Sequence, residues 1–277
     1  MQIVATENTI YTSPDASKIF CYTPSILVTP TGRLIVSFDL GGEGVKSIEG
    51  HKSSRAGGSR FGQGKIFISD DNGQKWTFVQ NFPFWHARLF TIGNSIYLIG
   101  HAGDICIMKS EDNGESWSDT YFLTHGEKWH SSACNVLFSN GNVYLAMEQR
   151  CRLNEVTGWD VAGLSPTLFR ACVEDNLCLA SSWSRSEKFI YKEVFDGAKL
   201  DFFGIPFYDC ETNKPKEIAT GINNAPLGWL EANVVKFVDK DHIWHTDLKE
   251  VFHLFLRAHT GGVNYAHLFK IEIQDDQ

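Results

Sequence analysis

The sequence reads Ser69-Asp70-Asp71-Asn72-Gly73-Gln74-Lys75-Trp76 and, 41 residues further on, Ser110-Glu111-Asp112-Asn113-Gly114-Glu115-Ser116-Trp117, so that both stretches share the pattern S-x-D-N-G-x-x-W. Each copy follows a short apolar run. Asn-Gly favours the positive φ of a tight hairpin, and an aspartate can accept hydrogen bonds from the N–H groups just downstream. The motif therefore predicts a turn between two strands, covered by its tryptophan, with a structural rather than a chemical role.

Apolar runs of strand length surround the two motifs and recur in the same order. A degenerate third copy, Ala180-Ser181-Ser182-Trp183, keeps a serine and the tryptophan. The predicted strands are Thr23–Val28, Arg33–Phe38, Lys65–Ile68 and Trp76–Val79 in a first group; Ala87–Phe90, Ser95–Ile99, Asp104–Met108 and a run after Trp117 in a second; Ser132–Phe138, Asn142–Met147 and Leu168–Val173 in a third; and Trp229–Val235, Phe252–Arg257 and Tyr265–Ile273 in a fourth.

A four-stranded unit that repeats about every 45 to 60 residues is typical of propeller blades. We therefore predict an all-β fold, a β-propeller of four-stranded blades that forms a single domain over residues 1–277. The alternative is a pair of β-sandwiches. Four to five blades are recognisable, and the last group lacks a fourth strand. Either the ring is incomplete at the C-terminus, or a blade is hidden between Ser184 and Pro226.

The amino-acid composition agrees with an all-β domain and reduces the classes of binding partner to consider. The 277 residues include 20 Phe, 8 Trp, 8 Tyr and 24 Gly, and the net charge is −8. This charge argues against a nucleic-acid partner, and no stretch has the apolar length of a membrane span. The seven cysteines lack CxxC spacing, so we interpret them as reduced and buried. No signal peptide is visible, which leaves a cytoplasmic or a processed secreted protein open.

Two insertions follow second strands of the repeat. Gly41–Gly64 is rich in Gly, Ser and basic residues, and Cys151–Gly163 contains Trp159 and Asp160. Long loops in compact domains are often functional. Because loops on one edge of successive blades converge on one face, we expect the site on that face.

The chain resembles the sialidase-like β-propeller superfamily, whose Asp-box matches the two turn motifs. Further likeness to a bacterial branch, whose members are commonly labelled exo-sialidase or BNR-repeat proteins, lies in Tyr22–Ile26, Trp129–Ala133 and Gly228–Val235. The resemblance implies a carbohydrate-active protein that acts on a glycan or oligosaccharide without a cofactor. True sialidases hold the substrate carboxylate with three arginines, the first within Phe-Arg-Ile-Pro. The equivalent stretch here, Cys21–Ile26, has no arginine, which argues against authentic sialidase activity.

Four polar residues at blade starts and second-strand ends are the candidate catalytic groups. Glu148 ends an apolar strand and opens a long loop, as a general acid or base would. His130 precedes a strand and can share that role, bind a uronate or cap the strand. Glu231 lies two residues after Trp229, so that a carboxylate stands near an aromatic ring that can stack on a sugar. Asp39 ends the first group's second strand, as an acid, a sugar-hydroxyl acceptor or an ordinary turn carboxylate.

The candidate substrate-binding residues combine aromatic, basic and titratable side chains at equivalent places. His242-x-x-His245 alone is too weak a signal for a metal site, and we predict none. The candidates are Trp85, His86, Arg88, His101, Trp229 and Arg257.

Three functions fit these residues. Glu148 and Glu231 suit an exo-glycosidase, one as acid and the other as base or nucleophile. His130 and His101, with a Tyr and an Arg, suit a lyase that eliminates across a uronic acid. A glycan-binding propeller without catalysis is the third.

Overall fold

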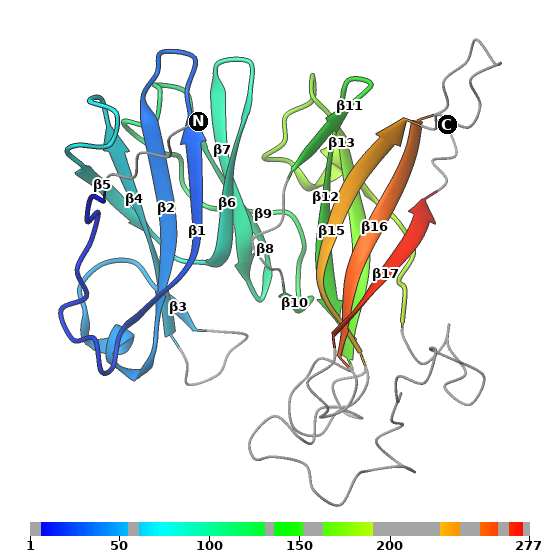
Figure 1. Ribbon diagram of the computed structural model, residues 1–277, viewed down its shortest axis with the longest axis horizontal. Helices are drawn as coiled ribbons and strands as arrows, with labels where there is room; N and C mark the ends of the chain where they lie inside the picture. Colours follow the sequence, from blue (N-terminus) through cyan, green and yellow to red (C-terminus); the bar gives the residue numbers. More distant parts are fainter. Residues whose placement is uncertain are drawn as a thin grey trace, which may run out of the picture. The chain divides into compact units, whose positions relative to one another are not determined.

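The computed structural model describes residues 7–54, 61–130, 136–151, 163–190, 228–238, 250–259 and 266–273. The chain divides into two compact units: unit 1 comprises Met1–Gly126 and Cys178–Ala180, and unit 2 comprises Glu127–Leu177 and Ser181–Gln277. All sheets are antiparallel (Figure 1). No helix in the described part of the chain is long and apolar enough to cross a membrane.

Unit 1 contains two sheets, and both follow the predicted strand groups. The first has the order β1-β2-β4-β3 with β5 also paired to β4, and the second has the order β6-β7-β8-β9. The strands are β1 (Phe20–Val28), β2 (Leu34–Gly41), β3 (Ser53–Ser54), β4 (Phe61–Ser69), β5 (Thr77–Phe82), β6 (Trp85–Ile92), β7 (Ser95–Ala102), β8 (Asp104–Ser110) and β9 (Tyr121–Phe122). The insertion after β2 is not only a loop, because it holds the 3-10 helix η1 (Glu43–Ser47) and β3.

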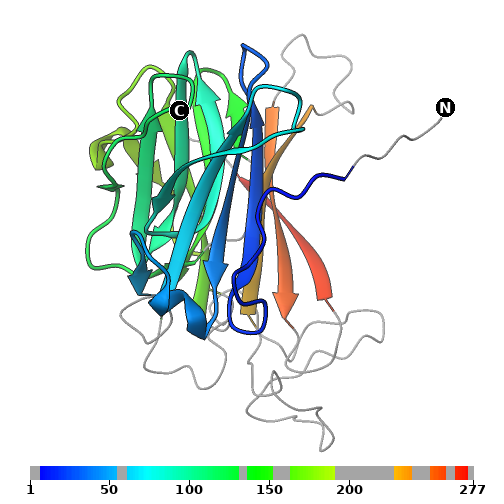
Figure 2. The ribbon, with the colours of Figure 1, turned by 90° about the vertical axis from the view of Figure 1, so that its left-hand side faces the viewer.

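Apolar side chains fill both faces of the first sheet. On one face Ile35 and Ile66 pack with Leu89 and Leu98 of the second sheet. On the other face the N-terminal segment, dark blue in Figure 2, crosses the sheet where the ring of Tyr11 lies 5.5 Å from that of Phe38. Burial on two faces explains why β2 reads as a nearly continuous apolar run rather than an alternating one.

Unit 2 also contains two sheets. One has the order β10-β12-β13-β14 with β11 paired to β12, and the other has the order β15-β16-β17. The strands are β10 (Trp129–His130), β11 (Leu137–Ser139), β12 (Asn142–Arg150), β13 (Leu164–Cys172), β14 (Trp183–Arg185), β15 (Gly228–Val238), β16 (Glu250–His259) and β17 (Ala266–Ile273). A 3-10 helix, η4 (Ala180–Ser182), precedes β14 in the chain and begins in the last residue assigned to unit 1. Most of the predicted strand Ser132–Phe138 and of the insertion Cys151–Gly163 lies outside the described residues.

The two motif turns have the hydrogen bonds that their sequences predict. In the first, Ser69 Oγ accepts a bond from Gly73 N–H at 2.9 Å, and Asp71 Oδ1 accepts one from Lys75 N–H at 2.8 Å. Asn72 has a φ of 58°. The Trp76 indole N–H donates to the Gly73 carbonyl at 3.0 Å. The second turn repeats the serine and aspartate bonds with Ser110 and Asp112. The tryptophan of the degenerate copy, Trp183, closes its turn on the Leu177 carbonyl.

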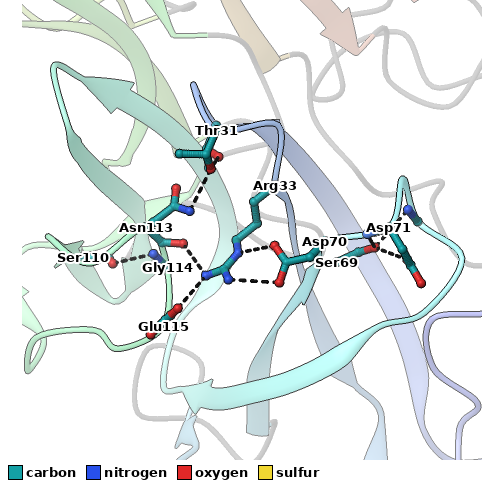
Figure 3. A network of polar contacts seen from close by, with 11 residues as sticks. Thr31, Arg33, Ser69, Asp70, Asp71, Ser110, Asn113, Gly114 and Glu115 are labelled. Carbon is teal, nitrogen blue, oxygen red and sulfur yellow. Dashed lines mark hydrogen bonds and ion pairs between the residues drawn. The ribbon is translucent and has the colours of Figure 1, made fainter.

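An arginine that the sequence does not single out joins the two turns. The Arg33 guanidinium forms a bidentate ion pair with Asp70, at 2.7 and 3.0 Å, and donates from Nη1 to the Asn113 carbonyl and to Glu115, each at 3.2 Å (Figure 3). Asn113 also donates to Thr31 Oγ1 at 2.9 Å. The network therefore ties the β1–β2 turn to both motif turns, and only 13% of the Arg33 side chain is exposed.

Replacing Ser69 with alanine is expected to lower the free energy of unfolding by about 1–2 kcal/mol. The Ser69 hydroxyl is buried, so its loss leaves the Gly73 N–H without an acceptor inside the turn. Urea unfolding of the two proteins measures the difference. Gln74→Ala, which changes an exposed side chain in the same turn, is the matched control and should have little effect. Equal destabilisation by the two substitutions would contradict the structural role of the motif.

Candidate functional site

A left-handed residue interrupts the first strand of three sheets. Thr23, His86 and Glu231 have φ values of 48°, 51° and 61°. Each lies within a register shift of its strand pairing, between Tyr22 and Ser25 in β1 and at the corresponding places in β6 and β15. Positive φ is unfavourable for residues other than glycine, particularly for β-branched threonine, and such strain concentrates at functional sites. The repeated bulge is therefore the first structural mark of a candidate site.

The second strand of each sheet places a polar candidate opposite this region. In β1, β6 and β15, the residue just before the bulge is paired with the polar candidate on the second strand. The register pairs are Tyr22 with Asp39, Trp85 with His101, Leu230 with Arg257 and, in β10, His130 with Glu148. Three residues chosen from the sequence at second-strand ends, Asp39, His101 and Arg257, thus share one register position, and Glu148 faces the first-strand residue His130.

In unit 2 the structure brings Glu148, His130 and the β15 bulge together. Glu148 is 1% exposed, and its Oε2 lies 2.5 Å from His130 Nδ1. Its Oε1 accepts a hydrogen bond of 2.8 Å from Ala232 N–H, in the neighbouring sheet. Both carboxylate oxygens therefore have partners. Ala232 directly follows Glu231, whose side chain is exposed. The backbone bond thus places the bulge that carries one candidate carboxylate against the other.

In unit 1 the equivalent group is built around Asp39, which is fully buried. Its Oδ2 accepts hydrogen bonds from Thr23 Oγ1 at 2.9 Å and from His86 N–H at 2.8 Å. Its Oδ1 accepts no bond of ordinary geometry from the described residues. Burial is the main influence on the Asp39 carboxyl group and raises its pKa from 3.8 to about 7, against the lowering effects of the hydrogen bonds from His86 and Thr23, of the nearby Ala87 amide and of the charge of Arg88.

Two histidines lie next to this carboxylate. His86 Nδ1 and His101 Nε2 are 3.1 Å apart, and the two ring centroids are 5.1 Å apart. His101 is buried, whereas His86 is half-buried. Arg88, two residues after His86, is also buried at 4% exposed. The backbone of His86 therefore contacts Asp39, and its ring contacts His101.

The aromatic candidates occupy core positions. Trp85 is 6% exposed, and a Cβ on Gly62 would lie only 2.1 Å from its ring, so glycine at 62 makes room for the indole. Trp229 is fully buried and stacks on Phe189 with ring centroids 5.5 Å apart. Neither ring presents a face for sugar stacking in this conformation, and their role in binding substrate stays a prediction.

Metal ligands do not cluster in the described part of the chain: no group of three or more His, Cys, Asp or Glu side chains there could hold an ion. The described cysteines, Cys21, Cys106, Cys151, Cys172 and Cys178, are free thiols. His242 and His245 lie outside the described residues.

Sequence reasoning missed the backbone half of the site. It selected His86 and Glu231 as side chains and did not identify Thr23, which donates to Asp39. The sequence does contain a signal for it, because the three first strands share a four-residue pattern. The pattern is an apolar residue, then a variable residue, then Pro or Ala, then a polar residue, and it occurs at Tyr22–Ser25, Trp85–Arg88 and Leu230–Asn233. Aligning these stretches would have shown a common bulge.

No protein-family model and no curated protein matches the chain in sequence. Among solved structures, the chain resembles an α-L-arabinofuranosidase from Lactobacillus brevis with a TM-score of 0.52 and 13% identity, over 95% of this chain and 76% of that one. A protein of unknown function from Dyadobacter fermentans gives a TM-score of 0.51 at 14% identity, over 92% of this chain and 66% of that one.

A Trypanosoma rangeli sialidase aligns with a TM-score of 0.46 and 11% identity, over 88% of this chain. The chain spans 30% of that sialidase's length. At these identities the likeness concerns the fold alone. The all-β class predicted from the sequence is confirmed, and the sheets are antiparallel.

Proposed function

We propose that the chain is a carbohydrate-active protein of the sialidase-like superfamily, a β-propeller of Asp-box-containing blades that acts as an exo-glycosidase on a glycan. Three observations support the fold part: the recurring antiparallel sheets, the two motif turns and the likeness to the arabinofuranosidase. A single propeller domain over residues 1–277 is part of the same proposal.

One observation carries the activity: the hydrogen bond from Ala232 N–H to Glu148 Oε1 places the Glu231 bulge against Glu148. Glycosidases use two carboxyl groups, or a carboxyl group with an equivalent proton carrier, on the scissile bond. Glu231 is exposed and is the carboxylate that we assign to the substrate. Glu148 is buried and acts through His130, in the way a buried carboxylate orients a catalytic imidazole.

Replacing Glu231 with glutamine is expected to lower turnover by about 10²-fold or more, because an amide cannot transfer the proton or act as the nucleophile. The experiment screens neutral, sialylated and uronate-containing glycans and follows reducing ends and unsaturated uronate together. Glu174→Gln, another exposed glutamate of unit 2, is the matched control and should retain wild-type turnover. Equal turnover in the Glu231→Gln and Glu174→Gln variants would remove Glu231 from the site.

The same screen tests the lyase alternative, which the His130–Glu148 pair favours. A histidine oriented by a buried carboxylate is suited to abstract the C5 proton of a uronic acid. Unsaturated uronate would then appear with the reducing ends, and the Glu231 substitution would matter less than a His130 substitution. Glycan binding without turnover by a folded protein would support the non-catalytic alternative.

A further inference from the structure

Asp39 joins two neighbouring sheets of unit 1 through one oxygen atom. Its Oδ2 accepts the Thr23 hydroxyl from its own sheet and the His86 N–H from the next sheet, at 2.9 and 2.8 Å. Both donors belong to left-handed residues, with φ values of 48° and 51°. One buried carboxyl oxygen therefore holds the bulges of β1 and β6 together.

Glu148 holds a bulge in unit 2 as Asp39 does in unit 1, but it uses both of its carboxylate oxygens. It accepts the bulge amide of Ala232 with Oε1 and contacts the His130 ring with Oε2. Glu148 thus needs two acceptor oxygens, whereas the two bonds of Asp39 need only one. An amide side chain retains one acceptor oxygen, so asparagine can replace Asp39 in this role although glutamine cannot replace Glu148.

We infer that Asp39 is a positioning residue that fixes His86 in its left-handed conformation, and that His86, paired with His101, is the side chain that unit 1 presents to a ligand. For the nature of that ligand, a glycan, the inference rests on the proposed function. Imidazole nitrogens can donate hydrogen bonds to, or accept them from, sugar hydroxyl groups.

The geometry explains why His86 needs an anchor. A left-handed conformation is unfavourable for histidine and persists only when surrounding contacts determine it. The His86 amide is the donor that ties this backbone to the buried carboxyl group. The ring then lies 3.1 Å from His101 Nε2, so a change in the backbone at His86 would also separate the two rings.

Three variants of the full chain test the inference: Asp39→Ala, Asp39→Asn and, as a matched control, Asp119→Ala, which changes an exposed aspartate of the same unit. The measurements are hydrogen exchange of the His86 amide, ring nitrogen signals of His86 and His101, and turnover of the glycan found in the screen. We expect alanine to speed exchange at His86 by at least about tenfold, to change both ring signals and to lower turnover by about 10–100-fold. Asparagine should restore all three.

Two results would overturn the inference. The first is unchanged exchange at His86 in the Asp39→Ala variant, because the carboxyl group would then not hold that backbone. The second is an Asp39→Asn variant with a protected His86 amide and turnover as low as that of Asp39→Ala, which would make Asp39 itself a proton donor. If the wild-type chain turns over no glycan, the proposed function fails, and the exchange and ring signals alone decide the anchoring role.

Discussion

Replacing Glu148 with glutamine is expected to lower glycan turnover by about 10³–10⁴-fold, since a wrongly oriented catalytic imidazole costs about that much. The reason lies in the two contacts of the carboxylate. Ala232 N–H and the His130 ring each face one oxygen, and glutamine has only one oxygen to offer.

In the Glu148→Gln variant, the backbone N–H of Ala232 determines which way the glutamine amide is oriented. The Ala232 N–H is a fixed donor, so the glutamine oxygen is expected to face it and the amide NH₂ to face His130 Nδ1. The imidazole must then accept at Nδ1 and carry its proton on Nε2, the opposite of the tautomer that donates to a carboxylate. Ring ¹⁵N signals of His130 measure this change independently of turnover.

The Glu174→Gln variant again serves as the control, because it removes a carboxylate from unit 2 without touching His130. Retained near-UV circular dichroism would show that the loss is not a folding defect. Wild-type turnover in Glu148→Gln, with the ring tautomer changed, would remove the His130–Glu148 pair from the mechanism. An unchanged tautomer would instead contradict the hydrogen bonding described here.

The all-β class, the motif turns and most strands could be predicted from the sequence because their signals are local. Asn72-Gly73 and Asn113-Gly114 dictate turns through positive φ, and both occur where predicted. Strand boundaries were less accurate: β4 begins at Phe61 rather than Lys65, because pairing with β2 and β3 extends a segment whose glycines weaken the apolar pattern. Local chemistry therefore predicted the strands and turns, whereas pairing partners set their lengths.

The sequence predicted the polar side chains of the candidate site but not their partners, because those partners are backbone groups brought close by tertiary packing. Glu148, His130 and Asp39 stood out as polar residues at strand ends. That Glu148 reaches the amide of residue 232, and Asp39 that of residue 86, depends on how neighbouring sheets pack. The Arg33 network was missed for the same reason, since Asp70 and Glu115 are 37 and 82 residues away in sequence.

Replacing Asp39 with asparagine is expected to stabilise the protein at alkaline pH and to have little effect near pH 4. The pKa of Asp39 is about 7 in the folded protein, against an ordinary value of 3.8. Between these values the folded state holds a proton that the unfolded state has released. The stability that this proton contributes is fully present below about pH 4 and is lost as the pH rises through about 7.

The size of the loss follows from the two pKa values and amounts to about 4 kcal/mol at pH 8, as an upper limit. Asparagine cannot ionise and keeps an acceptor for Thr23 and His86, so the variant should escape this loss. Urea unfolding of both proteins at steps from pH 4 to pH 8 gives the difference in unfolding free energy, in which other titrating groups largely cancel. Asp119→Asn, at an exposed position of unit 1, is the matched control. A flat difference for Asp39→Asn would mean that Asp39 is ionised in the folded protein throughout this range, and that its buried site is better solvated than its contacts indicate.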